Sequence, residues 1–215
     1  MFLIKPSFEI LTPITKDIYK NIEIAGRVCY KSEDRITDDS SEKFVRGIIK
    51  SGHDSVLEHQ SVSVRLICDR GVSHELVRHR IASYSQESTR YCNYRGGVTF
   101  IIPPWVDIPV GEYKPGDDPA NNKADALWFN ACLNDELYYL ELLKCGWTSQ
   151  QARDVLGISV KTEIIMTMNL REWRHFFNLR AVGTTGKPHP QMSEITVPLL
   201  DKFKSLLLYI FEDII

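Results

Sequence analysis

The chain lacks the cysteine pattern of a secreted or zinc-stabilised protein. Its 215 residues include five cysteines that are widely spaced and contain no CxxC pair. This arrangement argues against a disulfide framework and against a zinc ribbon. A reducing compartment, the cytoplasm, is therefore the location that we expect.

The chain also lacks a strong excess of one charge and a long apolar run. It has 26 basic and 28 acidic residues and a formal net charge of −2. Non-specific nucleic-acid binders usually carry a large positive excess, so we expect no nucleic-acid partner and only a local anion site. No apolar run approaches the roughly 20 residues that span a bilayer. The first residues, MFLIKP, lack the layout of a signal peptide. We expect neither a targeting segment nor a membrane partner.

The hydrophobic pattern predicts strands and helices in mixed order. Expected strands cover residues 2–11, 60–68, 98–103 and 158–168. Expected helices cover 15–30, about 40–49, a stretch after Gly71 that includes Arg80, 123–145, 170–180, and 191 to the C-terminus. The Pro-, Gly-, Asp- and Asn-rich stretch 107–123 and residues 183–188 are expected to be loops. Without strict alternation of strand and helix, the pattern favours an α+β fold.

One short segment, residues 78–95, gathers the groups that bind a nucleotide. It reads RHRIASYSQESTRYCNYR and carries four arginines against one acid, Glu87. Guanidinium groups bind phosphate or carboxylate through paired hydrogen bonds, hydroxyls add donors, and tyrosine rings add stacking faces. The alternative interpretation is a solvated helix end with surface salt bridges, which is the commoner role of an isolated arginine cluster.

A second segment, residues 51–59, contains two histidines and two carboxylates. His53 and His59 are six positions apart, whereas the histidines of a metal-binding HExxH helix are four apart. Ser55 and Glu58 have the S-x-x-E spacing of a capping box. We therefore predict a helix start here and no metal site.

A third segment, residues 169–180, combines an aromatic face with a cationic one. The polar residues that share one side of a helix here are Arg171, Arg174, His175 and Asn178. An ordinary amphipathic helix explains the aromatic residues but not the excess of cations over acids. The chain has no GxSxG elbow, no P-loop and no GxGxxG fingerprint, which argues against hydrolase, P-loop and Rossmann chemistry.

These segments resemble the flavin-dependent thymidylate synthase family. Arg78-His79-Arg80, seven further residues and then Ser88 match that family's RHR-x7-S motif, and YSQESTRY at 84–91 matches its extended form. Similar stretches occur at 51–59, 151–153, 169–171, 176–180 and 189–192. The resemblance extends roughly from Gly26 to Gln191.

The resemblance implies an activity, cofactors and an architecture. Family members methylate dUMP reductively to dTMP, with methylenetetrahydrofolate as carbon donor and NADPH as reductant through bound FAD. The family also implies one domain over residues 1–215, with a central mixed or antiparallel sheet flanked by helices and long C-terminal helices. Its members form homotetramers whose active sites are assembled from several subunits.

The resemblance also assigns roles to individual residues. The FAD-binding positions are Ser55, Arg78, His79, Arg80, Gln86, Asn169, Arg171 and His175. The dUMP-binding positions are Glu75, Arg78, Gln86, Glu87, Ser88, Thr89, Arg90, Arg153 and Arg180. Arg180 is also the catalytic position, at which a cation helps to ionise the uracil N3–H. Ser88 has no evident base partner in the sequence, so we expect it to bind substrate rather than act as a nucleophile.

Two of these positions differ from the commonest residue of the family. Glu75 stands where several members carry Gln, and an acid beside a phosphate is unfavourable unless it faces away or pairs with an arginine. His175 stands where some members carry Asn, and it adds a titratable proton.

The competing hypothesis is a non-catalytic nucleotide- or RNA-binding module that uses the same arginines and tyrosines. It predicts oligonucleotide binding that weakens steeply with salt. The balanced net charge disfavours it. A third interpretation, a helical interaction protein with surface arginines, predicts no small-molecule binding.

Overall fold

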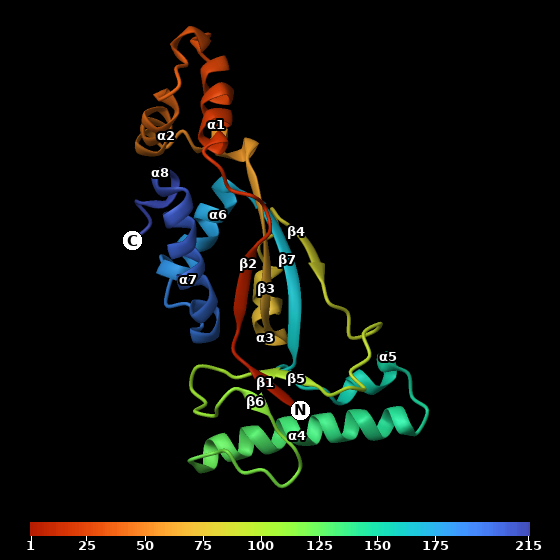
Figure 1. Ribbon diagram of the computed structural model, residues 1–215. Coiled ribbons are helices and arrows are strands. Elements are labelled where there is room, and N and C mark those ends of the chain that lie inside the picture. Colours follow the sequence, from red (N-terminus) through yellow and green to blue (C-terminus); the bar gives the residue numbers. More distant parts are fainter. The chain divides into compact units, whose positions relative to one another are not determined.

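Two β-sheets and a set of helices make up the computed structural model, which describes all residues from 1 to 215 (Figure 1). One sheet has the strand order β5-β1-β6 and the other β2-β3-β7-β4. The strands are β1 (Phe2–Ile4), β2 (Ser7–Ile10), β3 (Ser61–Asp69), β4 (Ser83–Gln86), β5 (Thr99–Ile101), β6 (Gly111–Glu112) and β7 (Lys161–Asn169). In the first sheet β1 pairs parallel with β5 and antiparallel with β6, so this sheet is mixed.

The helices range from single turns to α4, which has 22 residues. The α-helices are α1 (Asp17–Val28), α2 (Ser40–Ser51), α3 (Arg70–Leu76), α4 (Lys123–Lys144), α5 (Ser149–Ala152), α6 (Leu170–Phe177), α7 (Pro190–Leu206) and α8 (Leu208–Phe211). The 3-10 turns are η1 (Glu33–Arg35), η2 (Asp54–His59) and η3 (Arg153–Val155), and η4 (Asn178–Val182) is a π-helix. No helix is both long enough and apolar enough to cross a lipid bilayer.

The contacts of the chain divide it into two units. The first consists of Met1–Ser7, Leu66–Arg78 and Tyr84–Ile165, and the second of Phe8–Arg65, His79–Ser83 and Met166–Ile215. Strands β3 and β7 are each nine residues long, and the chain passes from one unit to the other within each of them.

The core of the first unit lies between the three-stranded sheet and α4, which runs along it in Figure 1. Leu3 and Phe100 on the sheet and Phe129 and Tyr139 on the helix are buried there. Glu136 on α4 is buried as well, and its carboxylate accepts hydrogen bonds from the Val98 amide at 2.8 Å and from the Met1 ammonium at 2.7 Å. These bonds offset the cost of burying the charge.

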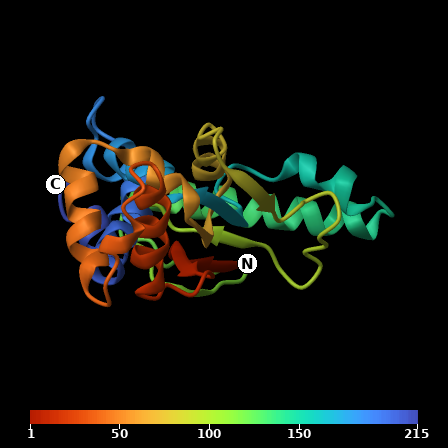
Figure 2. The ribbon, with the colours of Figure 1, turned by 90° about the horizontal axis from the view of Figure 1, so that it is seen from above.

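An aromatic cluster forms the core of the second unit. Trp173, Phe176 and Phe177 on α6 pack against one another, and Trp173 and Phe177 also pack against Phe203 on α7, with ring centroids 5.1–5.6 Å apart. The Trp173 indole N–H donates to the carbonyl of Val62 in β3 at 3.0 Å, so this large side chain is buried with its polar atom satisfied. In the same unit α1 and α2 pack side by side (Figures 1 and 2).

The predicted α+β class is confirmed, and a long C-terminal helix is present. The helix expected from 191 to the C-terminus ends at Leu206, and the separate short helix α8 follows it. The strand expected over 2–11 is two strands, because Pro6 between them has no amide hydrogen to donate. The helix after Gly71 ends at Leu76, so Arg80 lies outside it, contrary to expectation. Strand β4 was not predicted, because its polar sequence SYSQ lacks an apolar alternation. A single family domain over 1–215 stays a prediction.

The capping box expected at Ser55 and Glu58 is absent. Residues 54–59 form the 3-10 turn η2 without a side-chain cap. The Glu58 carboxylate instead accepts a hydrogen bond from Arg171 at 2.6 Å. The Glu58 side chain therefore bonds a charged residue of α6 instead of the backbone of its own turn.

Replacing Trp173 by alanine tests the importance of the aromatic cluster. We expect the free energy of unfolding to fall by about 3–5 kcal/mol, because the change leaves a large cavity and an unpaired carbonyl. Trp147→Ala is the matched control, since the side chain of Trp147 is 46% exposed. Urea denaturation of both variants measures the difference, and equal losses would contradict this description of the core.

Candidate functional site

In the first unit, the end of strand β4 fixes the position of the residues that follow Gln86. The Gln86 amide nitrogen donates to the hydroxyls of Ser73 on α3, at 3.0 Å, and Thr162 on β7, at 3.1 Å. These bonds fix the end of β4 between two other elements. The structure therefore gives Gln86 a positioning role in addition to the ligand-binding role that the sequence predicted.

Glu87, the only acid of the arginine-rich segment, is paired internally. Its carboxylate accepts hydrogen bonds from the Tyr94 hydroxyl at 2.7 Å and the Lys161 ammonium at 3.0 Å. Burial raises the pKa of Glu87, but these two bonds outweigh burial and hold the pKa below its ordinary value. Glu87 is thus charged at neutral pH, and Lys161 lies between its carboxylate and that of Glu163, which it contacts at 2.7 Å.

The tyrosines of this segment have different environments. The Tyr84 hydroxyl donates to the Leu76 carbonyl at 2.7 Å, and burial raises the pKa of Tyr84 to about 12. Tyr94 is half-buried against Glu87. Only Tyr91 is widely exposed, at 76%, with the Arg90 guanidinium 5.2 Å from its ring centroid. The prediction that all three rings offer stacking faces therefore applies to Tyr91 alone.

A cavity of about 260 Å³ opens beside the loop that follows β4. Its lining consists of Arg70, His74, Thr89, Arg153, Leu156, Gly157, Ile158 and Val160. Arg153 donates to the Thr89 hydroxyl at 3.3 Å, and Arg70 donates to the Glu87 carbonyl at 3.1 Å. The Arg70 Nε is buried without a hydrogen-bond partner, so an acceptor on a ligand would satisfy it.

The remaining predicted residues of the first unit lie in this loop or on and after α3. Arg90 donates to the Gln150 side chain at 3.0 Å, and the Ser88 hydroxyl accepts from the Arg90 amide at 3.2 Å. Glu75 is half-buried on α3, and Arg78 is exposed beyond the end of that helix. With cations and hydroxyls next to apolar side chains, this region suits an anion attached to a flat ring.

In the second unit, His79 and Arg180 join two distant motifs. The Arg180 Nε donates to the His79 Nε2 at 3.0 Å, across 101 positions of sequence. The imidazole packs edge-on against Phe176, with ring centroids 4.9 Å apart. Burial, the Arg180 charge and His175 lower the pKa of His79 to about 4. The imidazole is therefore neutral at physiological pH and acts as an acceptor.

Arg180 lies on a π-helix rather than on regular α-helix. The π turn η4 (Asn178–Val182) continues α6 and ends at Gly183, whose φ of 83° lies in the left-handed region. The Arg180 carbonyl also accepts from the Thr196 hydroxyl on α7 at 2.6 Å. Single π turns are rare and often occur at functional sites. The extra residue in the turn rotates Arg180 away from the position that an α-helix would give it.

The cationic face predicted for 169–180 is divided between different partners. Arg171 pairs with Glu58, whereas Arg174 forms a bidentate pair with Asp213 at 2.7 Å and also bonds the Ile210 carbonyl. Arg174 thus connects α6 to the C-terminal residues, and its role is to stabilise the fold. Asn169 caps α6 by accepting from the Glu172 amide at 2.9 Å.

The other predicted flavin-binding residues of this unit are available to a ligand. Ser55, Arg80 and His175 have exposed side chains. The guanidinium of Arg80, together with a hydroxyl and an imidazole, is a suitable donor set for a pyrophosphate, and Arg171 adds the donors that its pair with Glu58 does not use. The residues present therefore fit FAD. No group of three or more His, Cys, Asp or Glu side chains that could hold a metal ion is found.

The predicted residues fall mostly into two sets. The dUMP set lies in the first unit except for Arg180, and the FAD set lies in the second except for Arg78 and Gln86. Sequence reasoning missed Arg70 and His74 in the cavity, as well as Lys161 beside Glu87. Arg70 lies two residues after the strand predicted over 60–68, near a strand end where site residues often occur, and this signal could have identified it.

Known proteins that this chain resembles point to one family. Residues 11–207 match the family model described as thymidylate synthase complementing protein. A flavin-dependent thymidylate synthase of Geobacter sulfurreducens is 33% identical over 93% of this chain and 83% of its own length. The enzyme of the same name from Pyrococcus furiosus is 34% identical over 79% of this chain and 69% of its own length.

The fold matches solved structures along nearly the whole chain. The UMP/dUMP methylase PolB of Streptomyces cacaoi, bound with 5-Br dUMP, superimposes with a TM-score of 0.77 at 24% identity, over 99% of this chain and 96% of that one. Because the family model and the relatives both cover most of the sequence, the chain belongs to the flavin-dependent thymidylate synthase family.

Proposed function

We propose that this protein methylates dUMP to dTMP, taking the carbon from methylenetetrahydrofolate and the reducing equivalents from NADPH through bound FAD. The observation that carries the proposal is the hydrogen bond from Arg180 to His79. It joins the RHR motif to the C-terminal motif that the family resemblance assigns to catalysis.

The first unit supplies the nucleotide site in this proposal. Arg70 and Arg153 meet the phosphate of dUMP at the cavity, where Thr89 adds a hydroxyl donor. Leu156 and Val160 offer an apolar surface to the base. The Glu87 side chain is held by Tyr94 and Lys161 rather than by Arg70 or Arg153, so the guanidinium groups of both arginines can bind the dianionic phosphate.

Arg180 stabilises negative charge on the uracil ring. When N3–H ionises, charge develops on the base, and a guanidinium already held in place stabilises it without reorganisation. A neutral His79 accepts from the Arg180 Nε without cancelling the positive charge. A carboxylate in the same position would neutralise the cation that the reaction needs.

The second unit supplies the flavin site. His79, Arg80, Arg171, Ser55, Asn169 and His175 are the residues of this unit that would hold FAD. The family resemblance assigns Arg78 and Gln86 to the cofactor as well. When bound, FAD supplies hydride transfer between NADPH and the one-carbon unit. The residues of the chain bind the cofactor, orient it and place positive charge near its pyrophosphate.

We further propose a cytoplasmic homotetramer with sites shared between subunits. All five cysteines are free, as expected in a reducing compartment. Several large apolar side chains are exposed, including Tyr30 at 76%, Leu127 at 63% and Ile158 at 68%. Exposed apolar groups of this size are typical of subunit interfaces when they are contiguous.

The assay of dTMP formation tests the proposed reaction, and Arg180→Lys tests the role of Arg180. The purified wild-type protein, supplied with FAD, should form dTMP from dUMP, methylenetetrahydrofolate and NADPH. Arg180→Lys keeps the charge but loses the Nε donor, so turnover should fall about 100- to 1,000-fold. The control Arg46→Lys changes an exposed arginine elsewhere and should keep full turnover. Equal turnover of all three proteins would contradict the assigned role.

Replacing Arg153 by alanine separates the nucleotide site from the flavin site. Losing one charge-assisted contact to the phosphate should raise the KM for dUMP about tenfold or more. The bound FAD content, read from the flavin absorption band, should not change. Lys144→Ala, an exposed site in the same unit, is the control. An unchanged KM would remove Arg153 from the proposed site.

The pKa of His79 predicts a pH dependence of stability. Its pKa of about 4 in the fold lies below the ordinary 6.5 of the unfolded chain, so acid protonates the unfolded chain first. The contribution of His79 to stability is complete above pH 6.5 and is lost as the pH falls towards 4. His79→Gln does not titrate, so its thermal midpoint should fall less than that of the wild type between about pH 7 and 4.5. Parallel losses would contradict the lowered pKa.

A further inference from the structure

Helix α4 has apolar side chains on two opposite faces. One face packs on the core of the first unit, where Phe129 and Tyr139 are buried. On the other face the side chains of Leu127 and Tyr138 are 63% and 58% exposed. A surface helix of a globular protein normally has one apolar face and one polar face. The second apolar face of α4 is therefore unusual for a helix that is surrounded by water on that side.

The exposed face of α4 carries no charge over most of its length. Every exposed residue between Lys123 and Glu141 is uncharged, and these residues are Ala124, Leu127, Asn130, Ala131, Asn134, Leu137 and Tyr138. Two of the acids in this stretch, Asp125 and Glu136, are buried. The third, Asp135, is half-buried and accepts a hydrogen bond from the Gly157 amide at 2.8 Å. Depletion of charge is typical of the centre of a protein–protein interface.

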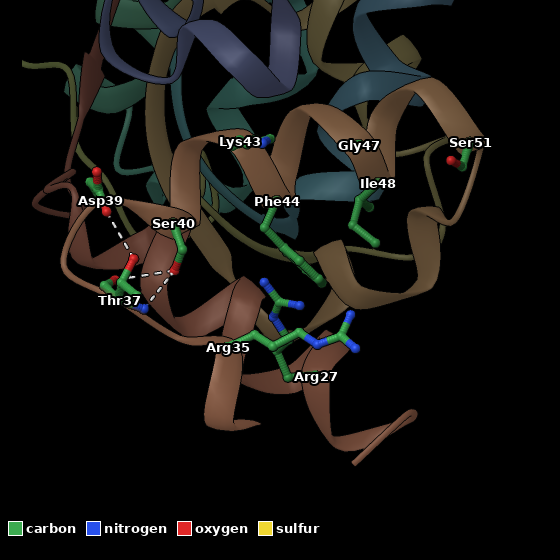
Figure 3. Close-up of a pocket in the computed structure, with 10 residues that line it drawn as sticks. All are labelled: Arg27, Arg35, Thr37, Asp39, Ser40, Lys43, Phe44, Gly47, Ile48 and Ser51. Carbon is green, nitrogen blue, oxygen red and sulfur yellow. Dashed lines mark hydrogen bonds between the residues drawn. The ribbon is translucent and has the colours of Figure 1, made fainter. Parts of the chain in front are cut away.

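Helix α2 shows the ordinary composition of an exposed helix face in this chain. Its exposed residues include three cations, Lys43, Arg46 and Lys50. Phe44 lies on another side of α2, beside a cavity of about 690 Å³, with its ring centroid 4.8 Å from the Arg27 guanidinium. Figure 3 shows Lys43 directed away from this side. Charged residues thus occupy the solvent side of α2, whereas the corresponding side of α4 is uncharged.

The exposed face of α4 is complementary to itself when a second copy of the helix runs in the opposite direction. Leu127 and Tyr138 are 11 residues apart, about three turns, so both lie on the same side of the helix. A two-fold axis midway between them places Leu127 of each copy against Tyr138 of the other. The same axis places Ala131 against Asn134 at the centre, where small side chains let two helices approach closely.

The charges at the two ends of this face favour the antiparallel direction. Lys123 and Glu141 are 18 residues apart, about five turns, and lie on the same side of the helix. Antiparallel pairing brings Lys123 of each copy next to Glu141 of the other, whereas parallel pairing brings like charges together. Glu141 also pairs with Lys144 of its own helix at 2.7 Å. Both of these side chains are exposed, so Glu141 is still accessible to a second copy.

We propose that α4 forms a contact between two copies of this chain, in which the two helices run antiparallel about a two-fold axis near Cys132 and Leu133. Two-fold contacts of this kind are the commonest way in which soluble proteins form dimers. The inference deepens the proposed homotetramer by naming one of its contacts, and in this respect it rests on that proposal. It does not depend on the proposed reaction, because no residue assigned to FAD or dUMP lies on α4.

Sedimentation equilibrium of the full-length protein measures the assembly, and Leu127→Glu tests the contact. The new carboxylate would lie against Tyr138 of the second copy without a partner, so the contact should be lost and the mass of the assembly should halve. Leu127→Met is the matched control, because it keeps an apolar side chain of similar size and should keep the wild-type mass. Leu127 is exposed within one copy, so the far-ultraviolet circular dichroism spectrum should be the same for all three proteins.

A charge exchange tests the antiparallel direction. Lys123→Glu places like charges at both ends of the contact and should weaken association about tenfold. Adding Glu141→Lys to the same chain makes opposite charges meet again and should restore association. A parallel pair predicts no effect of either change, because like charges already meet in it. Lys20→Glu reverses an exposed lysine on α1 and should associate as the wild type does.

The proposal is overturned if the wild-type protein is monomeric, if Leu127→Glu keeps the wild-type mass, or if Lys123→Glu and the double variant associate equally. A wild-type tetramer that Leu127→Glu leaves intact would keep the homotetramer and remove α4 from its contacts. A wild-type dimer that Leu127→Glu splits would keep the α4 contact and contradict the tetramer. The two proposals can therefore fail separately, and neither outcome depends on dTMP formation.

Discussion

The hydrogen bond from Arg180 to a neutral His79 is the interaction on which this account of the site depends. A catalytic cation must be held firmly without losing its charge, and most partners of arginine are carboxylates that neutralise it. Burial beside Phe176 and the positive charge of Arg180 itself keep the imidazole unprotonated. The π turn then sets the direction from which Arg180 reaches it. The fold thus holds Arg180 with an uncharged acceptor, the His79 imidazole, which leaves the positive charge of Arg180 intact.

The same requirement explains how a chain of net charge −2 sustains an anion site. In the first unit the Glu87 carboxylate bonds Tyr94 and Lys161, so Arg70 and Arg153 make no salt bridge with it and line their cavity. In the second unit Arg174 is committed to Asp213 and serves the fold. Local pairing therefore separates structural cations from functional ones, a distinction that net charge does not reveal.

The sequence predicted the parts of this site that depend on motif spacing and local periodicity. The RHR-x7-S spacing and the C-terminal motif identified the family, and the apolar pattern gave the α+β class and the long helix α4. The sequence did not predict hydrogen bonds between residues far apart along the chain, because no local pattern specifies them. Glu58 was assigned to a cap but pairs with Arg171, and Gln86 was assigned to ligands but also bonds Ser73 and Thr162. The polar strand β4 and the π turn were missed because tertiary contacts, rather than propensity, fix both.

Nitrogen-15 NMR of the His79 imidazole tests the central claim most directly. At pH 5.5 an unperturbed histidine is about nine-tenths protonated. With a pKa of about 4, His79 should still be neutral there, with an unprotonated Nε2 that accepts from Arg180. A doubly protonated ring at that pH, or a neutral ring with its proton on Nε2, would contradict the account.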